Sequence, residues 1–238
     1  MPAPYSGRVV VVTGASRGLG ALLVHHFLGG GAVVVGMSRG PATVTLTGYT
    51  HHEVDVGDAD AVRAAFVAIG RVHGRVDVLV NCAAVLTSIH AMLMPAERAE
   101  EMVRTNFLGA FYVSREAAKL MRKRKSGRII NIGSMAVTLE PVGDSVYAAT
   151  KAASMTLTGI LAKELAGYGI TVNTLAVSAV ETDMLRQLPR DQVDRVVAGL
   201  PLARMATLAD IANVIDFFAS PASDYVTAQT IFLGGVHA

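Results

Sequence analysis

The segment Arg8-Val-Val-Val-Val-Thr13-Gly14-Ala-Ser-Arg-Gly18-Leu-Gly20 decides the fold. Its unbroken β-branched run is typical of a strand that is buried on both faces of a sheet. Three glycines follow at once, and a helical stretch then continues to about Gly30. Glycines at such a junction permit a tight turn and let the backbone approach a pyrophosphate at the helix N-terminus. The segment therefore predicts the opening strand, turn and helix of a dinucleotide-binding sheet.

The rest of the chain alternates apolar runs with amphipathic stretches. Apolar strands separated by helices imply parallel strands joined by right-handed crossovers. We expect an α/β, Rossmann-type doubly wound parallel sheet of about seven strands, with helices on both faces and one domain over residues 1–238. The expected further strands cover residues 32–37, 49–54, 76–81, 128–133, 170–176 and 230–233. The expected helices cover residues 18–30, 58–73, 96–125 (as one helix or two), 145–167, 191–199 and 208–220.

Composition narrows the possible classes of protein. Hydrophobic residues make up 52% of the 238 residues and charged residues 17%, which suits strands buried on both faces or a subunit interface. No uninterrupted apolar run reaches membrane-spanning length, and no signal peptide is recognisable, so we expect no membrane association. The single cysteine, Cys82, excludes an intramolecular disulfide and fits a cytoplasmic protein. A net charge of +2 gives no case for nucleic acid, and we expect no metal site.

The end of the second expected strand predicts which dinucleotide is bound. Domains that prefer NAD usually carry an acidic residue there, which binds the ribose 2′-hydroxyl. This chain has Gly36-Met-Ser38-Arg39 instead. Arg39 is suited to a bidentate contact with a 2′-phosphate, and Arg17 in the glycine turn lies on the same side. These residues favour NADPH over NADH; the alternative is that both arginines are simply solvated.

Two more strand ends carry candidate cofactor contacts. Asp55 and Val56 end the third expected strand, where the aspartate would hydrogen-bond the adenine amine or serve as a turn or cap residue before Asp58. Both interpretations of Asp55 stay open. Asn81 and Ala83, at the end of the fourth strand, are expected to pass the adenosine ribose.

Tyr147 and Lys151 carry the candidate chemistry. They lie in the helical run Ser145–Ser154, where a spacing of four puts both side chains on one face. A lysine ammonium favours a nearby phenolate, so we expect it to lower the pKa of the tyrosine. Such a tyrosine can exchange a proton with a carbonyl or an alcohol. The spacing of Tyr147 and Lys151 alone is weak evidence for this chemistry, and the other motifs of the chain strengthen it.

The combination of motifs resembles the short-chain dehydrogenase/reductase family over nearly the whole chain. The likeness rests on Thr13-Gly14-x-x-x-Gly18-x-Gly20, Asn81-Cys82-Ala83, Asn106, Ser134, Tyr147-x-x-x-Lys151 and the tail from Asp183-Met184 to Gly235. The chain is most similar to the 3-oxoacyl-carrier-protein reductase branch. That likeness rests on Gly127-Arg-Ile-Ile-Asn-Ile-Gly-Ser134, Gly169-Ile-Thr-Val-Asn173, Glu181-Thr-Asp-Met184 and Pro201-Leu-Ala-Arg204.

The resemblance implies a role for each site residue. Ser134 would hold the substrate oxygen and Tyr147 would protonate it. Lys151 would lower the pKa of the tyrosine and bind the nicotinamide ribose, and Asn106 would hold a water linking Lys151 to solvent. Taken singly, each could instead be an ordinary structural residue. The implied cofactor contacts are Gly14, Ser16, Arg17, Gly18, Leu19, Gly20, Ser38, Arg39, Asp55, Val56, Asn81, Ala83, Tyr147, Lys151, Val180 and Thr182.

Several positions depart from the family pattern. Ala84 replaces a glycine and is expected to crowd the ribose slightly. Val177-Ser178 replaces Pro-Gly where the nicotinamide normally lies, so the loop backbone is expected to differ there. Ala228 and Gly234 replace a glycine and an aspartate or asparagine. The segment Gly40–Gly48 is too short for a full helix.

The expected substrate is a ketone with an aliphatic or polyketide-like tail. A lid over about residues 182–200 is expected to cover it. His90 and His237 could reach the mouth of the pocket, although surface positions are favoured for both. The expected walls hold no residue that would read a charge: Met135, Leu139, Val142, Val177, Met184 and Leu185.

A basic cluster, Arg122-Lys-Arg-Lys125 with Arg128, either complements a helix C-terminus or docks an acyl carrier protein or phosphopantetheine thioester. Lys125 matches a basic carrier-contacting position of the resembled branch. Tyr168 stands where that branch has a second basic residue, so docking is only half supported.

Three functions remain in competition. The leading prediction is an NADPH-dependent ketoreductase acting on a ketone or acyl thioester. The alternatives are an NAD-dependent secondary-alcohol dehydrogenase and a non-catalytic nucleotide-binding subunit of a hetero-oligomer. The family resemblance also implies a homo-oligomer, tetramer or dimer, packed through the helices at residues 96–125 and 145–167.

Overall fold

A computed structural model describes residues 3–42 and 45–236. It contains a seven-stranded sheet in the order β3-β2-β1-β4-β5-β6-β7, in which every pairing is parallel. The order reverses between β1 and β4, as it does in doubly wound folds. The fold class predicted from the sequence is confirmed.

The elements match the expected ones to within a few residues. The strands are β1 Val9–Thr13, β2 Val33–Ser38, β3 Tyr49–Glu53, β4 Val78–Asn81, β5 Gly127–Ser134, β6 Ile170–Val177 and β7 Thr230–Phe232. The helices of eight residues or more are α1 Gly18–Gly29, α2 Ala59–His73, α4 Ala110–Arg122, α6 Ser145–Leu165, α7 Arg190–Ala198 and α8 Leu208–Ala219. Shorter helical pieces are η1 Ala91–Leu93, α3 Ala96–Met102, η2 Val103–Gly109, α5 Ala136–Leu139, η3 Ala166–Tyr168, η4 Leu185–Gln187 and η5 Pro221–Ser223.

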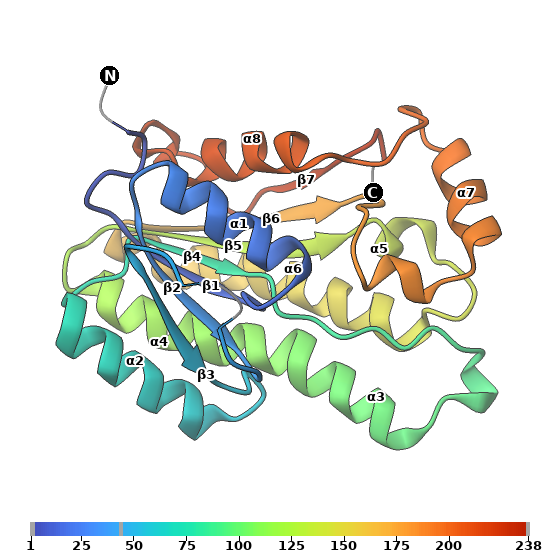
Figure 1. The fold of residues 1–238 in the computed structure, drawn as a ribbon, viewed down its shortest axis with the longest axis horizontal. Coiled ribbons are helices and arrows are strands. Elements are labelled where there is room, and N and C mark those ends of the chain that lie inside the picture. Colours follow the sequence, from blue (N-terminus) through green and yellow to red (C-terminus); the bar gives the residue numbers. More distant parts are fainter. Residues whose placement is uncertain (1–2, 43–44, 237–238) are drawn as a thin grey trace.

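The valine run of β1 divides its side chains between two cores. Val9 and Val11 pack with residues of α2, α4 and α6, whereas Val10 and Val12 pack with residues of α1 and α8. Successive side chains of a strand point to opposite faces, so a central strand needs apolar residues at every position. Figure 1 shows α8 along one face of the sheet and α2 and α4 along the other. The uninterrupted valines thus follow from a three-layer architecture.

The region 96–122, for which one helix or two was left open, is a continuous helical run. The π-helical turn η2 joins α3 to α4. Asn106 lies within this turn. Single π-turns inside helices occur frequently at functional sites, because the extra residue turns side chains to new directions.

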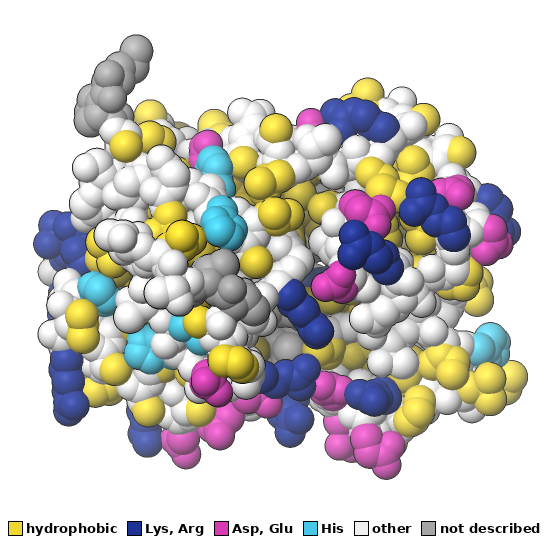
Figure 2. All heavy atoms as spheres, in the orientation of Figure 1, with side chains coloured by type: hydrophobic (Ala, Val, Ile, Leu, Met, Phe, Trp, Pro, Cys, Tyr) yellow, Lys and Arg dark blue, Asp and Glu magenta, His cyan; other side chains and the backbone are white. Residues whose placement is uncertain are grey.

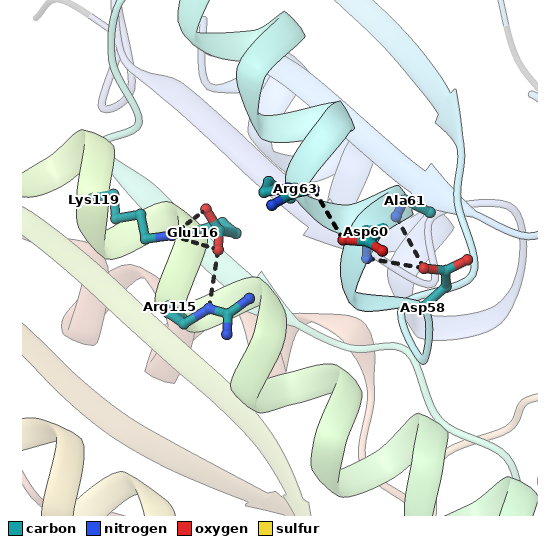
Figure 3. Close-up of polar contacts among 7 residues, drawn as sticks. All are labelled: Asp58, Asp60, Ala61, Arg63, Arg115, Glu116 and Lys119. Atoms are coloured by element: carbon teal, nitrogen blue, oxygen red, sulfur yellow. Dashed lines mark hydrogen bonds and ion pairs between the residues drawn. The ribbon is translucent and has the colours of Figure 1, made fainter.

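Polar contacts mark the helices that flank β1 on one side. Asp58 caps α2, since its carboxylate accepts from the backbone N–H groups of Asp60 at 2.9 Å and Ala61 at 3.0 Å (Figure 3). On α4, the buried Glu116 accepts from Arg115 at 3.0 Å and Lys119 at 2.7 Å (Figure 3). The cap explains why α2 begins directly after Asp58.

The segment between β2 and β3 is described in two parts. Residues 40–42 and 45–48 form no helix, as expected, while Thr43 and Val44 lie outside the described residues. Within the described ranges, no helix has the length and apolar character needed to cross a membrane.

The described surface carries both signs of charge and some apolar side chains. Figure 2 shows acidic and basic side chains intermixed along the lower and right-hand margins of one face. Among the large apolar residues, Met92 is 87% exposed and Leu93 is 67% exposed in η1, which precedes α3.

Ala228 predicts a stabilising substitution. Its φ is +60°, a left-handed conformation, and its side chain is exposed. Because this region disfavours any side chain, we expect Ala228→Gly to raise the free energy of unfolding by about 1 kcal/mol, after allowing for the extra freedom of glycine in the unfolded chain. Urea unfolding measures the change. Ala64→Gly, at an exposed position inside α2, is the matched control and should lower stability by about 0.5–1 kcal/mol; equal effects of the two changes would contradict the strain argument.

Candidate active site

A cavity of about 960 Å³ lies at the carboxyl edge of the sheet. Parallel α/β sheets bind ligands at this edge, near the point where the strand order reverses. The glycine turn after β1, the ends of β2 and β4, α3, the end of β5, α6 and the segment 177–200 all contribute to its wall. Its volume is at the upper end of the range for small-molecule and cofactor sites.

The glycine turn has a backbone that side chains would block. Gly14 has φ +69°, and a Cβ on it would come within 2.9 Å of the Cα of Ala83. A Cβ on Gly20 would lie 2.2 Å from the carbonyl oxygen of Gly14. Gly18 has φ +55° and open space beside it, with Thr182 as its nearest neighbour at 3.9 Å. The chain thus brings bare backbone to the wall of the cavity.

Helix α1 begins at this turn with features that suit an anion. Arg17, which precedes the helix, makes no side-chain cap hydrogen bond, and the first turn of α1 carries no acidic residue. Helix N-terminal N–H groups and the positive end of the helix dipole attract phosphate. The site therefore fits the diphosphate of a dinucleotide.

The structure places nearly all predicted cofactor residues in the cavity wall. Those lining it are Gly14, Ser16, Arg17, Gly18, Leu19, Gly20, Ser38, Arg39, Asp55, Val56, Ala83, Tyr147, Lys151, Val180 and Thr182. Asn81 is the exception. Its amide donates to Ser114 at 2.9 Å and to Asn131 at 2.8 Å, so the side chain joins β4 to α4 and β5 behind the cavity.

Asp55 makes a turn contact and also lies where a cofactor contact is predicted, so the adenine contact stays a prediction. Its carboxylate accepts the backbone N–H of Gly57 at 2.9 Å, which is a turn contact, and the residue also lines the cavity. The cap of α2 belongs to Asp58.

The loop that carries Arg39 is held by a residue that the sequence did not single out. The hydroxyl of Ser38 donates to the carbonyl of Gly40 at 2.9 Å, and His51 Nε2 lies 3.0 Å from the same carbonyl. Arg39 itself is paired, since its Nη1 lies 2.9 Å from Oε1 of Glu101 on α3. Arg39 is 52% exposed as well as paired, so the 2′-phosphate contact and the solvated alternative both stay open.

Ser134, Tyr147 and Lys151 meet at the end of β5. Ser134 ends the strand, its hydroxyl acts to lower the pKa of Tyr147, and its Oγ accepts the Ala136 N–H at 3.1 Å. Lys151 Nζ donates to the carbonyl of Ile132 at 2.8 Å and lies 5.8 Å from the centre of the Tyr147 ring. All three are buried and line the cavity.

The predicted lowering of the tyrosine pKa is wrong for this structure. Burial raises the pKa of Tyr147 to about 12, although the Ser134 hydroxyl acts in the opposite direction. Burial also lowers the pKa of Lys151 to about 8. Loss of solvation is the largest cause of both shifts, because both groups are enclosed. At neutral pH the tyrosine therefore keeps its proton and is placed to donate it.

Asn106 fixes the loop after β4. Its Oδ1 accepts the N–H of Val85 at 2.8 Å, and its Nδ2 donates to the Val85 carbonyl at 2.9 Å and to Thr150 at 3.2 Å. A second cavity of about 10 Å³ is bordered by Asn106 and Lys151. That volume suits about one water molecule. The water expected between Asn106 and Lys151 stays a prediction.

Most, but not all, of the residues predicted to form the substrate wall line the cavity. Met135, Leu139, Val177, Met184 and Leu185 line the cavity, as predicted. Val142 does not; it is 83% exposed and lies in a turn.

Charged residues also reach the substrate half, although none was expected there. Asp144, Asp183 and Arg195 all line the cavity. Asp144 is buried at the N-terminus of α6, three residues before Tyr147, and burial raises the pKa of its carboxyl. Its position three residues before Tyr147 in the sequence could have indicated that Asp144 lies near the site.

The segment over the cavity is helical and held by ion pairs. It contains η4 and α7, and its apolar residues Val193 and Leu200 are buried and line the cavity. Arg186 pairs with Glu181 at 2.9 Å and with Asp183 at 2.8 Å, both within the segment. Figure 1 shows α7 beyond the ends of the strands. A lid over residues 182–200 fits this arrangement.

Two of the unusual positions compensate each other. Ser178 is buried, and a Cβ on Gly234 would approach the Cβ of Ser178 to 3.3 Å. The glycine thus leaves room for the serine after β6. Ala84 lines the cavity, as its place after Ala83 implied. His90 is exposed, and His237 lies outside the described residues.

The prediction of a basic surface cluster is wrong for one of its residues, Arg128. The other residues of the cluster lie far from the cavity. Arg128 is buried, and its guanidinium donates to the carbonyls of Gly127 at 3.0 Å and Ser220 at 3.4 Å. Arg122–Lys125 are exposed but precede β5, whereas Ser134 ends it. Eight strand residues separate the two edges by about 23 Å.

Sequence comparison agrees with this fold. The family model described as short chain dehydrogenase matches residues 8–193. The chain belongs to the short-chain dehydrogenase family, and it is therefore an oxidoreductase whose fold is built to bind a nicotinamide dinucleotide.

Named relatives give a finer comparison. The chain is 33% identical over 236 residues to 3-oxoacyl-acyl-carrier-protein reductase FabG of Vibrio harveyi, covering 96% of each chain. It is 33% identical over 232 residues to the reductase MabA of Mycobacterium tuberculosis, covering 98% of this chain and 93% of that one. The solved structure of Thermoplasma acidophilum aldohexose dehydrogenase matches with a TM-score of 0.89 at 24% identity, over 99% of this chain and 95% of the other. That last likeness supports the fold alone.

Proposed function

We propose that this protein is an NADPH-dependent ketoreductase that reduces the ketone of an apolar substrate, a 3-oxoacyl thioester or polyketide-like molecule. The observation that carries the proposal is the meeting of Ser134, Tyr147 and Lys151 at the cavity end of β5. The named reductase relatives, at 33% identity over nearly the whole chain, support the choice of substrate class.

The proposed roles follow from where these groups lie. Ser134 would orient the substrate carbonyl with its hydroxyl. Tyr147, protonated at neutral pH because burial raises its pKa to about 12, would give its proton to the oxygen as negative charge develops there. Lys151 would bind ribose hydroxyls and stabilise the phenolate that Tyr147 leaves behind. When bound, NADPH would supply the hydride, while the protein supplies placement.

The cofactor preference is proposed from two arginines. Arg17 and Arg39 line the same end of the cavity, and no acidic residue follows β2 directly. A guanidinium there is suited to a 2′-phosphate. The pairing of Arg39 with Glu101 weakens this argument without reversing it, because Arg98 also contributes positive charge beside that glutamate.

The proposed function also includes a substrate class, a docking partner and an oligomeric state. An acyl thioester fits the apolar wall and the lid over residues 182–200. Docking of an acyl carrier protein on Arg122–Lys125 would need a second subunit to bring that cluster to the cavity, since it lies at the other edge of its own sheet. A homo-oligomer, tetramer or dimer, remains a prediction; Ile160 on α6 is 50% exposed and available for such packing. We also retain the prediction of a cytoplasmic location.

The experiment is NADPH or NADH oxidation with a panel of ketones that includes 3-oxoacyl thioesters. Turnover preferring NADPH supports the proposal, whereas turnover only as alcohol oxidation with NAD supports a secondary-alcohol dehydrogenase. Dinucleotide binding without turnover on any ketone or alcohol would leave a non-catalytic nucleotide-binding subunit. The raised pKa of Tyr147 disfavours oxidation at neutral pH, because that direction needs the phenolate.

The pKa shifts predict the pH profile of reduction. Lys151 has a pKa lowered to about 8, so it loses its charge as the pH rises through that value, while Tyr147 stays protonated. We expect kcat/KM for NADPH, which reports groups of the free enzyme, to be nearly flat below pH 7 and to be about tenfold lower one pH unit above the Lys151 pKa. A profile that stays flat to pH 10 would contradict the assignment of Lys151.

A further inference from the structure

Two arginines and one glutamate from opposite rims of the cavity form what we call the rim cluster: Arg39, Arg98 and Glu101. Arg39 follows β2, whereas Arg98 and Glu101 lie three residues apart on α3. Glu101 Oε1 accepts from Arg39 at 2.9 Å and its Oε2 accepts from Arg98 at 3.0 Å. All three residues line the cavity. One carboxylate therefore joins the loop after β2 to α3.

The electrostatics of the rim cluster favour a charged Glu101. Its side chain is 19% exposed, compared with 52% for Arg39 and 61% for Arg98. Hydrogen bonds from Arg39 and then Arg98 lower the pKa of Glu101, against the effect of burial, so the carboxylate is ionised at neutral pH. Two positive charges and one negative charge leave a net charge of +1 at this rim.

We propose that Glu101 is a specificity-determining residue that competes with the 2′-phosphate of the cofactor for Arg39. Its oxygen occupies a guanidinium N–H of Arg39 that a phosphate oxygen would otherwise take, and both acceptors are negatively charged. The inference rests on the proposed function, in which Arg39 binds that phosphate.

The competition has a defined direction. A dianionic phosphate attracts Arg39 more strongly than a carboxylate does, so the phosphate displaces the Glu101 carboxylate from Arg39. Glu101 then keeps its hydrogen bond with Arg98. An unphosphorylated ribose brings no charge, so the Arg39–Glu101 pair stays closed. Glu101 thus lowers affinity for the phosphorylated dinucleotide and leaves affinity for the unphosphorylated one nearly unchanged.

Calorimetric titration tests this with two probes that differ by the phosphate: adenosine 2′,5′-bisphosphate and 5′-AMP. In Glu101→Gln the rim charge rises from +1 to +2 and Arg39 is released. We expect the Kd of the bisphosphate to fall about three- to tenfold, and that of 5′-AMP to change by less than about twofold. Glu100→Gln is the matched control, because Glu100 is exposed on the same helix and its change adds the same net charge; it should leave both Kd values nearly unchanged.

A double-mutant cycle assigns the effect to Arg39. The gain should vanish when Glu101→Gln is combined with Arg39→Gln. Unchanged or weaker bisphosphate binding in Glu101→Gln, or a gain that persists without Arg39, would overturn the inference. Failure of the NADPH proposal would give a different result. The unaltered protein would then bind the bisphosphate no tighter than 5′-AMP, and Arg39→Gln would change neither of the two Kd values.

Discussion

Tyr147→Phe is expected to bind NADPH with unchanged affinity and to lose about 10²–10⁴-fold in the rate of ketone reduction. The substitution removes only the hydroxyl, which is the proposed proton donor. The ring packs with Met102 and Ala136, so the variant keeps those contacts and should fold. Fluorescence titration with NADPH and single-turnover reduction of a ketone measure the two quantities separately.

The matched control is Tyr168→Phe. Tyr168 is 40% exposed in η3 and lies outside the cavity wall, so the same chemical change there should leave turnover unaltered. Near-normal turnover in Tyr147→Phe would contradict the proton-donor role. If the variant instead lost NADPH binding while its NADPH-bound form reduced the ketone at the normal rate, Tyr147 would be assigned to the cofactor site.

Gly20→Ala is expected to weaken cofactor binding and the fold together. The added Cβ would lie 2.2 Å from the carbonyl oxygen of Gly14, and backbone cannot yield as a flexible side chain does. The turn must shift, at a cost of about 1–3 kcal/mol in the free energy of unfolding. If the shift moves the N–H groups at the start of α1, the Kd for NADPH rises about ten- to a hundredfold. Urea unfolding and fluorescence titration measure these effects.

The same helix offers a control for Gly20→Ala. Gly29 is exposed near the end of α1, and a Cβ there would meet nothing within 4 Å. Gly29→Ala should therefore stabilise the protein by about 0.5–1 kcal/mol and leave the Kd for NADPH unchanged. Wild-type stability and binding in Gly20→Ala would show that the turn has more freedom than its geometry allows.

Much of the fold could be predicted because local patterns and the tertiary structure agree. The valines of β1 need two apolar faces, and the sheet supplies α2, α4 and α6 on one side and α1 and α8 on the other. The carboxyl ends of parallel strands share one edge, so placing Ser134 at the end of β5 also placed it near the glycine turn. Spacing on α6 then brought Tyr147 and Lys151 to the same edge.

The failed predictions depended on contacts between distant parts of the sequence. Glu101 meets Arg39 from 62 positions away, and no local pattern indicates that pair. The buried position of Arg128 follows from carbonyls at the end of α8, which its neighbours in sequence do not reveal. The raised pKa of Tyr147 depends on enclosure, whereas a spacing of four residues gives only proximity to Lys151.

The most direct measurement of the central claim is isotope transfer from NADPH deuterated at the hydride position to a 3-oxoacyl thioester. Ser134, Tyr147 and Lys151 are placed to bind and protonate the carbonyl oxygen, so the deuterium should appear on the carbinol carbon of the product. Mass spectrometry should find one deuterium per alcohol formed, and almost no alcohol with Tyr147→Phe. Tight NADPH binding without deuterium in any product alcohol, across the ketone panel, would contradict the account.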